Sequence, residues 1–469
     1  MNGIMFADLT PKPEYAEVKR VYQNVGVRPV DMSKGELEIF NKSYFTPLGD
    51  NYLITWELLK DGEAVDNGNL SISEASAIPS RGSKRISVPY DSSSLDPQSE
   101  YLLNVRFSLA SDQPWAEKGY VQMEEQLPVK SGKWFTTAAL TGLTANSGNA
   151  SDKVTVAENP ATDTFIMSGE GFAVEFDNAT GALYSLKYDG KSLLAPDGAP
   201  RINAFRAPVD NDGWYYKDWF ANGLHDLRHK ATSKSMTTNA DGSVTLAYTV
   251  TSQAPDSTLA DNSTSGRYRL VKGKPMTEDD FRFISEQRYT IYPDGAVKVE
   301  ADITSNKPEV RLPRLGYSMK LPETYSDYTY YGRGPGNNFR DRRAGSDLGV
   351  YKSTVAEQFV NFPKPQSMGG REDVRWASLT DSDGRGVIFI PADTVSVSAL
   401  PWSDMEMTLA PHPKDLPAST GTNLHIDTRT LGLGGLSCGQ GGPLEDGQLY
   451  ATPHRISFII RPIRPAGSK

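Results

Sequence analysis

The sequence predicts an all-β fold that is divided into more than one domain. Its 469 residues exceed what one ordinary hydrophobic core encloses. The chain contains 41 Gly, 31 Pro and 22 Tyr, and short runs of Val, Ile, Thr and Tyr lie between the turn residues. That arrangement is typical of strands joined by tight turns, so we expect few helices.

Composition excludes several classes of function. With 49 Lys and Arg against 58 Asp and Glu, the formal net charge is −9, which disfavours a nucleic-acid partner. The single cysteine, Cys438, excludes an intrachain disulfide and a zinc site of several cysteines. No run approaches the roughly 20 apolar residues of a membrane span, and no secretory signal begins the chain. We expect a soluble protein without a membrane partner, and the sequence does not decide between cytoplasm and periplasm.

Residues 1–23 predict only one strand end and one short helix. An apolar run, Ile4-Met5-Phe6, precedes a turn at residues 8–11, and a helix is expected from Glu14 to about Gln23. Thr10 or Asp8 is a candidate cap for this helix. Such a segment is too small to form a domain, so we interpret it as the last piece of a larger one.

Residues 24–130 predict one β-sandwich. Runs with alternating apolar residues occur at 36–40, 52–58 and 101–107, separated by Gly, Pro, Asp and Ser. Their size and spacing fit an immunoglobulin-like sandwich. Residues 131–163 are small and polar, which predicts a linker.

Residues 164–469 predict a second and larger sandwich. Strand-like runs continue through this region, and a helix is indicated only at 217–229, followed by a loop at about 231–239. About 300 residues with so little helix imply two large packed sheets.

The segment Arg206-Ala-Pro-Val-Asp-Asn-Asp-Gly213, followed by Trp214, combines carboxylates, an amide and aromatic rings. Such loops suit sugars, whose hydroxyls need directed partners and whose C–H faces stack on rings. A salt-bridged turn, in which Arg206 pairs with Asp210 or Asp212, is the alternative.

Two further segments are rich in glycine, at residues 330–342 and 425–435. Their glycines permit positive φ angles or a close backbone approach, as in a loop around a ligand or at a tight hairpin corner. Neither segment is a nucleotide fingerprint, because no strand-glycine-helix unit surrounds it.

Taken together, these segments resemble the β-galactosidases of glycoside hydrolase family 2, and the resemblance extends over nearly the whole chain. The matching segments are residues 1–13, 115–120 with 125–126, 205–212, 313–316, 332–335, 370–376 and 432–435. The resemblance implies the end of a (β/α)8 barrel at 1–23, an immunoglobulin-like domain, and a galactose-mutarotase-like β-supersandwich at 164–469.

The resemblance also implies that the catalytic residues lie outside this chain. A retaining glycosidase needs two carboxyl groups about 5 Å apart, and in this family both are glutamates on barrel strands outside this chain. We therefore expect no catalytic residue here and no activity of the chain alone. The implied partners are a galactoside-type carbohydrate and a catalytic barrel domain or subunit. Family members are often oligomers, although no interface is specified.

Supporting residues are implied by position. Asn2 matches an asparagine that helps bind an active-site sodium beside the sugar, and no other cofactor is expected in this chain alone. Asp210, Asn211, Asp212 and Trp214 match a loop at the mouth of the active site. Where lactose-cleaving members place a sugar-stacking tryptophan, this chain has residues 436–439, Leu-Ser-Cys-Gly, so lactose is not assumed as substrate.

Other polar positions also depart from the family pattern. Asn337 replaces a glutamate, and Ser367-Met368 replace a Glu-Asn pair before Gly-x-Arg. The polar network that the family has at these positions is therefore not expected unchanged.

Two alternatives come from other functional classes. The large sandwich could be a non-catalytic carbohydrate-binding or structural module, with sugar stacking on Tyr330, Tyr331, Trp376 or Trp402, although aromatic residues in a sandwich are more often core.

Mutarotase activity would need a positioned general acid and base, usually histidine with glutamate. His225 and His229 share a predicted helix face, whereas His412, His425 and His454 are scattered along the chain. The sequence does not favour this activity.

Overall fold

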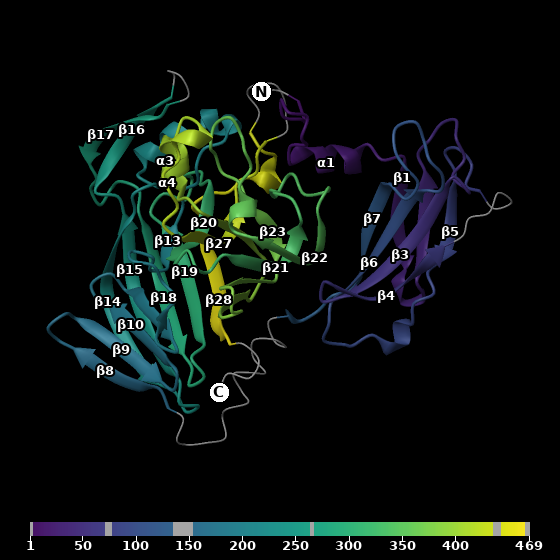
Figure 1. The fold of residues 1–469 in the computed structure, drawn as a ribbon. Helices are drawn as coiled ribbons and strands as arrows, with labels where there is room; N and C mark the ends of the chain where they lie inside the picture. The colour runs from purple at the N-terminus through teal and green to yellow at the C-terminus, as the bar shows by residue number, and fades with distance from the viewer. Residues whose placement is uncertain (1–2, 71–76, 135–152, 263–266, 435–441, 465–469) are drawn as a thin grey trace. The chain divides into compact units, whose positions relative to one another are not determined.

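The computed structural model describes residues 3–70, 77–134, 153–262, 267–434 and 442–464 (Figure 1). The chain divides into two compact units. The first comprises residues 1–137, 331–336 and 342–351, and the second comprises residues 138–330, 337–341 and 352–469. In the described part of the chain, no helix is long and apolar enough to cross a membrane.

The first unit contains the expected sandwich of two sheets. One sheet has the order β1-β2-β5, and the other has the order β4-β3-β6-β7. The strands are β1 Val25–Asp31, β2 Glu36–Asn41, β3 Tyr52–Lys60, β4 Glu63–Leu70, β5 Ser83–Ser87, β6 Tyr101–Leu109 and β7 Val121–Lys130.

Alternation of apolar residues positions the core of this sandwich. In β2, Leu37 and Ile39 are buried while the residues between them are partly exposed, as a strand with one buried face requires. Leu103, Val105 and Phe107 of β6 are buried in the same core. The predicted all-β sandwich is therefore confirmed for this region.

The N-terminal helix is shorter than expected and begins differently. α1 extends from Glu14 to Val21, and its N-cap residue is Pro13. The Asp8 carboxylate instead accepts hydrogen bonds from the backbone N–H and the hydroxyl of Thr10, at 3.0 and 2.6 Å. These residues form a turn of their own, so neither caps the helix.

The second unit is built on large sheets. A nine-stranded sheet has the order β14-β15-β18-β19-β28-β25-β24-β21-β22, and part of β21 and β22 belongs to the first unit. One five-stranded sheet has the order β13-β20-β27-β26-β23 and another has the order β12-β11-β10-β9-β8, while β16 and β17 form a two-stranded ribbon.

The strands of these sheets are β8 Thr155–Asn159, β9 Thr164–Gly169, β10 Phe172–Asp177, β11 Ala182–Tyr188, β12 Lys191–Ser192, β13 Arg201–Asn203, β14 Arg228–Thr238, β15 Val244–Gln253, β16 Asp256–Asp261, β17 Arg269–Pro275, β18 Phe283–Ile291, β19 Val297–Ser305, β20 Arg314–Leu321, β21 Asp327–Gly334, β22 Asp347–Thr354, β23 Arg371–Val374, β24 Trp376–Thr380, β25 Gly386–Pro391, β26 Val395–Leu400, β27 Thr422–Thr430 and β28 His454–Ile463. The α-helices of this unit are α3 Tyr216–Ala221 and α4 Asp404–Leu409.

The five-stranded sheet that contains β20 packs against the nine-stranded sheet. Tyr317 of β20 is buried, and its ring meets Phe458 of β28 with a centroid separation of 5.6 Å. Its hydroxyl donates to the side chain of Gln287 in β18 at 3.1 Å. These contacts form the interior of the predicted supersandwich.

Two sequence expectations differ from the structure in this unit. The linker expected at 131–163 contains β8, which pairs with β9 across a polar turn. The helix expected at 217–229 is limited to α3, and the loop expected at 231–239 is part of β14. β14 is an edge strand with mostly exposed Ser, Thr and Lys side chains, so it lacks the apolar alternation that identifies a strand.

A matched pair of leucines tests the core of the first unit. Leu103 is 0% exposed and Leu53 of β3 is 46% exposed. We expect Leu103→Ala to lower the free energy of unfolding by about 2–5 kcal/mol, because it leaves a cavity. Leu53→Ala should change it by less than about 0.5 kcal/mol. Amide hydrogen exchange in peptides from β6 measures the difference, and equal protection in both variants would contradict this core.

Candidate functional site

Arg206 and Asp212 form a buried ion pair at the predicted sugar loop. Their side chains are 1% and 3% exposed, and two bonds join them, Nε to Oδ2 at 3.1 Å and Nη2 to Oδ1 at 2.7 Å. The backbone N–H of Val209 also donates to Asp212, at 2.9 Å. Of the two partners that the sequence left open for Arg206, the structure thus selects Asp212.

The same arginine holds the glycine-rich segment at residues 425–435. Its guanidinium donates to the carbonyl oxygens of Leu431 and Gly432. A Cβ on Gly432 would lie 2.4 Å from a carboxylate oxygen of Asp341, so a larger residue there would displace that carboxylate. Asp341 itself accepts from the N–H groups of Leu433 and Gly434, at 2.9 and 2.8 Å. All three segments singled out in the sequence therefore meet.

The other residues of this loop face outward. η5 (Asp210–Trp214) is one 3-10 turn, in which Asp210 and Asn211 are exposed and Trp214 is 55% exposed. The Asn211 amide donates to the Leu433 carbonyl at 2.7 Å. The loop thus presents a carboxylate and an indole ring on a rigid base. Asn2, the remaining predicted residue, lies outside the described residues.

A lysine that the sequence did not indicate contributes to the charge near this loop. Burial lowers the pKa of Lys364 to about 8, and the negative charge of Asp210 partly opposes that shift. Its ammonium donates to the carbonyl oxygens of Thr408 and Ala410, at 2.8 Å each. No local sequence pattern distinguishes this lysine from a surface lysine.

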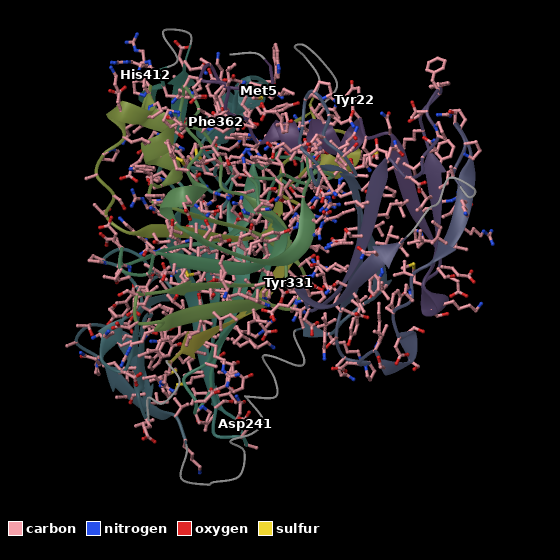
Figure 2. All side chains as sticks on the ribbon, turned by 45° about the vertical axis from the view of Figure 1, so that its right-hand side comes forward. Met5, Tyr22, Asp241, Tyr331, Phe362 and His412 are labelled. Atoms are coloured by element: carbon pink, nitrogen blue, oxygen red, sulfur yellow. The ribbon has the colours of Figure 1, made fainter. Side chains whose placement is uncertain are left out.

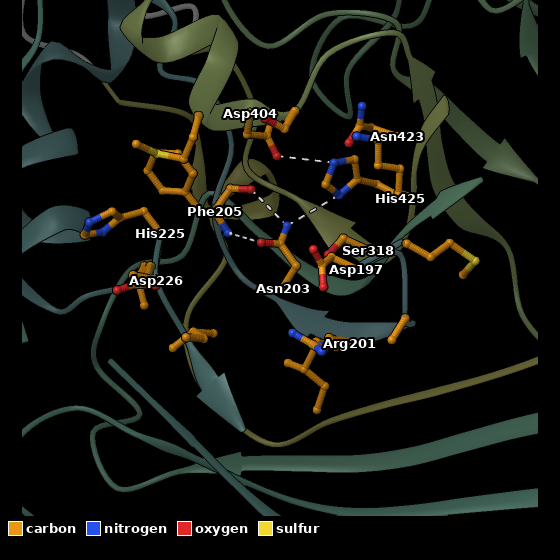
Figure 3. A pocket seen from close by; sticks show the side chains of 18 of the residues that line it. Asp197, Arg201, Asn203, Phe205, His225, Asp226, Ser318, Asp404, Asn423 and His425 are labelled. Carbon is orange, nitrogen blue, oxygen red and sulfur yellow. Dashed lines mark hydrogen bonds and ion pairs between the residues drawn. The ribbon is translucent and has the colours of Figure 1, made fainter. Parts of the chain in front are cut away.

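A separate cavity of about 340 Å³ lies on the polar face of the sheet that contains β27 (Figure 3). In β27, Asn423, His425 and Asp427 alternate with Leu424 and Ile426. Successive side chains of a strand point to opposite faces, so the polar residues share one face and the apolar residues the other. The floor of the cavity is this polar face.

His425 is held between two neighbours in the cavity. Its Nδ1 lies 3.4 Å from the amide nitrogen of Asn203, and its Nε2 lies 3.3 Å from Oδ2 of Asp404 (Figure 3). An amide N–H needs an acceptor, so Nδ1 accepts and Nε2 carries the proton on the side of Asp404. Burial and the nearby positive charge of Arg314 lower the pKa of His425 to about 3, and the negative charge of Asp404 partly opposes them. The imidazole is therefore neutral at pH 7.

Three of the five histidines lie together, contrary to the expectation from the sequence. His225 and His229 line the same cavity as His425. Burial lowers the pKa of His225, and it lowers the pKa of His229 to about 4 with help from Arg201 and Arg228. His225 and His229 are close in the sequence, but His425 lies about 200 residues further on, so its position in the sequence did not indicate that it joins them.

The other two histidines lie outside the cavity. His412 is exposed and lies 3.0 Å from Asp415 (Figure 2). His454 is partly exposed, and its Nε2 lies 3.0 Å from the Tyr450 carbonyl oxygen.

Two of the four aromatic residues proposed from the sequence as stacking platforms lie in the interior, whereas Trp376 and Trp402 are partly exposed. Tyr330 and Tyr331 are each 1% exposed, so neither can stack on a sugar. Tyr330 packs against Tyr328 at 5.1 Å and accepts from Arg371 at 2.7 Å. Trp402 donates to the Pro417 carbonyl oxygen at 2.8 Å. Among the described residues, no group of three or more His, Cys, Asp or Glu could hold a metal ion.

Comparison with known proteins gives consistent matches. A family model described as Beta galactosidase small chain matches residues 168–460, and one described as Beta-galactosidase, domain 4 matches residues 37–130. A β-galactosidase of Priestia megaterium is 30% identical over 467 residues, which is 98% of this chain and 41% of that protein. A β-galactosidase from Halalkalibacterium halodurans is 25% identical over 470 residues, which is again 98% of this chain and 41% of that protein. The chain thus spans less than half the length of these relatives.

Among solved structures, galactose 1-epimerase from Lactobacillus acidophilus NCFM aligns with 66% of this chain and 98% of that chain. The sequence identity is 9% and the TM-score is 0.33.

Asp212→Asn tests the buried pair. We expect it to lower the free energy of unfolding of the second unit by about 3–5 kcal/mol, because the buried guanidinium of Arg206 loses its compensating charge. Asp210→Asn, on the exposed side of the same turn, serves as the matched control and should change stability little. Urea unfolding measures both, and an Asp212→Asn protein as stable as the control would contradict the assignment.

His229 predicts a pH dependence of stability. Its folded-state pKa of about 4 lies below the ordinary value of about 6.5. As the pH falls from about 6.5 to about 4, the unfolded chain binds this proton first, so the free energy of unfolding decreases. His229→Gln should make that decrease smaller. Urea unfolding of both proteins at about pH 7.5 and about pH 5 measures the effect, and identical pH dependences would exclude it.

Proposed function

This chain belongs to the family of the β-galactosidase small chain, and we propose that it is the C-terminal part of a β-galactosidase-type retaining glycoside hydrolase. The match over 98% of the chain to 41% of a β-galactosidase supports this most directly. The reaction would be hydrolysis of terminal β-galactosyl residues. Its two carboxyl groups must lie about 5 Å apart on a rigid scaffold, and the family resemblance assigns them to a barrel outside this chain.

The loop of η5 is the part of this chain that we assign to the rim of the active site. The buried Arg206–Asp212 pair fixes its backbone, so Asp210 and Trp214 are presented in a defined geometry. A carboxylate accepts hydrogen bonds from sugar hydroxyls, and an indole ring covers the C–H face of a pyranose. Asp212 acts in this proposal as a positioning residue, and Asn211 holds the loop through Leu433.

Two further parts of the proposal concern the partner and the cation. The chain alone would be inactive and would need the barrel domain or subunit. Asn2 would contribute to sugar binding and to a sodium site formed in the complete enzyme, and this chain alone holds no cofactor in the proposal.

A chimera tests the proposal. This chain replaces the aligned C-terminal region of the Priestia megaterium β-galactosidase, and hydrolysis of an aryl β-galactoside is measured. We expect activity from the chimera and none from this chain alone. Trp214→Ala in the chimera should lower kcat/KM about tenfold, which corresponds to about 1.4 kcal/mol of lost transition-state binding.

The matched control is Trp115→Ala, which removes another exposed tryptophan, 59% exposed, from the first unit. It should leave kcat/KM unchanged. Equal losses from Trp115→Ala and Trp214→Ala would contradict the assignment of the rim. A folded chimera without hydrolysis would contradict the proposed function.

A further inference from the structure

The cavity on the sheet of β27 contains polar side chains without protein partners. Among the described residues, Asp197, Arg201 and Ser318 line this cavity and have no side-chain hydrogen bond or ion pair. Arg201 lies directly opposite Ser318, and Ser318 lies directly opposite His425, so these residues form one row across three strands. Neighbouring strands place such a row on one face, about 5 Å apart.

Further groups in the cavity are only partly used. Asn423 donates through Nδ2 to the Pro401 carbonyl oxygen at 3.3 Å, which leaves its Oδ1 as an acceptor. His229 meets Ser252 through Nδ1 at 2.8 Å, which leaves Nε2. Nδ1 of His225 is buried and has no partner.

The base of the cavity is fixed before any ligand binds. Asn203 donates to the Phe205 carbonyl oxygen at 3.0 Å and to His425, and Nε2 of His425 lies 3.3 Å from Asp404 (Figure 3). Asp404 also accepts from Arg314 at 3.2 Å. Each of these side chains is therefore fixed in position, and the geometry of the floor needs no rearrangement on binding.

Apolar atoms complete the lining. Leu224, Met405 and Phe205 also line this cavity. A mixture of apolar surface and converging donors and acceptors matches a pyranose, which has C–H faces and a rim of hydroxyls. The volume of about 340 Å³ lies near the lower limit for small-molecule sites, roughly 300–1000 Å³, which favours one sugar ring over a long oligosaccharide.

The charged groups of the cavity are largely balanced. Of the three carboxylates that line it, Asp226 is paired with Arg228 at 2.7 Å and Asp404 with Arg314 at 3.2 Å. Asp197 and Arg201 then leave one acceptor and one donor group of opposite charge without protein partners. A neutral polyol can use both the donors and the acceptors.

We propose that this cavity is a binding site for one neutral monosaccharide in its pyranose form. The proposal goes beyond the proposed function, because none of its residues belongs to the η5 loop and no barrel residue is needed.

Titration of the whole chain with a sugar tests the proposal. D-galactose and D-glucose are added separately, and binding is followed by calorimetry and by saturation-transfer NMR. We expect at least one of the two sugars to bind with a Kd on the order of 1 mM or tighter. Galactose 1-phosphate should bind no more tightly than galactose, because Asp197 faces the cavity without a paired cation.

Variants locate the binding. Arg201→Gln and Asp197→Asn should each weaken binding about tenfold, because each removes one charged hydrogen-bonding group from the sugar. Both residues are exposed and without partners, so folding should be kept, and Asn tolerates the positive φ of 57° at position 197. Arg455→Gln, at a side chain of β28 that is 62% exposed, is the matched control and should not change the Kd.

Three outcomes would overturn the proposal. They are no binding of either neutral sugar at about 50 mM, an unchanged Kd in both cavity variants, and tighter binding of galactose 1-phosphate than of galactose. Trp214→Ala separates this site from the rim, since it should leave the Kd unchanged. If this chain binds no sugar, the chimera is still expected to hydrolyse the aryl β-galactoside. If the chimera is inactive, this chain is still expected to bind a sugar in the cavity.

Discussion

The ion pair of Arg206 and Asp212 is the interaction on which the loops of the second unit depend. A guanidinium that is 1% exposed requires a charge partner and a full set of acceptors. Asp212 supplies the charge, and the carbonyl oxygens of Leu431 and Gly432 supply further acceptors. One side chain thereby joins residues 205–214 to residues 431–434, which are more than 200 positions apart. Exposed residues on these loops have fixed positions because the buried ion pair holds the backbone of the loops.

The sheet of β13, β20, β27 and β26 obeys a second constraint, the alternation of faces. Tyr317 and Ile426 face the interior, and Ser318 and His425 lie on the opposite face. Gly316 makes this geometry feasible, because a Cβ there would lie 2.1 Å from the Ile426 carbonyl oxygen. The donors and acceptors on a sheet face that lines a cavity need hydrogen-bond partners. The chain of Asn203, His425 and Asp404 supplies them for the floor.

The sequence predicted the architecture better than the sites. The sandwich of residues 24–130 was visible because half-buried strands alternate apolar and polar residues. β14 was not visible, because its exposed side chains carry no such pattern. The match to the β-galactosidase small chain confirmed the family that the ordered segments indicated.

Site residues depended on long-range pairing that no local pattern reveals. A turn rich in Asp is compatible with Arg206 pairing with Asp210 or Asp212, and only the fold shows which carboxylate is buried. The cavity was missed for the same reason, since β13, β20 and β27 contribute its floor from residues 201, 318 and 425. Tyr330 and Tyr331 were plausible stacking rings by residue type, but the sheet places both in the interior.

Asp404 connects the two candidate sites and limits how they can be separated. Its Oδ1 accepts from the backbone N–H of Ala207 at 3.1 Å, directly beside Arg206, while its Oδ2 meets Arg314 and His425. Removal of this carboxylate would leave the buried Ala207 N–H without its acceptor, would remove the neighbour of the His425 Nε2, and would leave the buried Arg314 with Asp427 as its remaining carboxylate. Both sites would be disturbed at once. Peripheral residues such as Arg201 and Trp214 are therefore the positions at which each site can be perturbed alone.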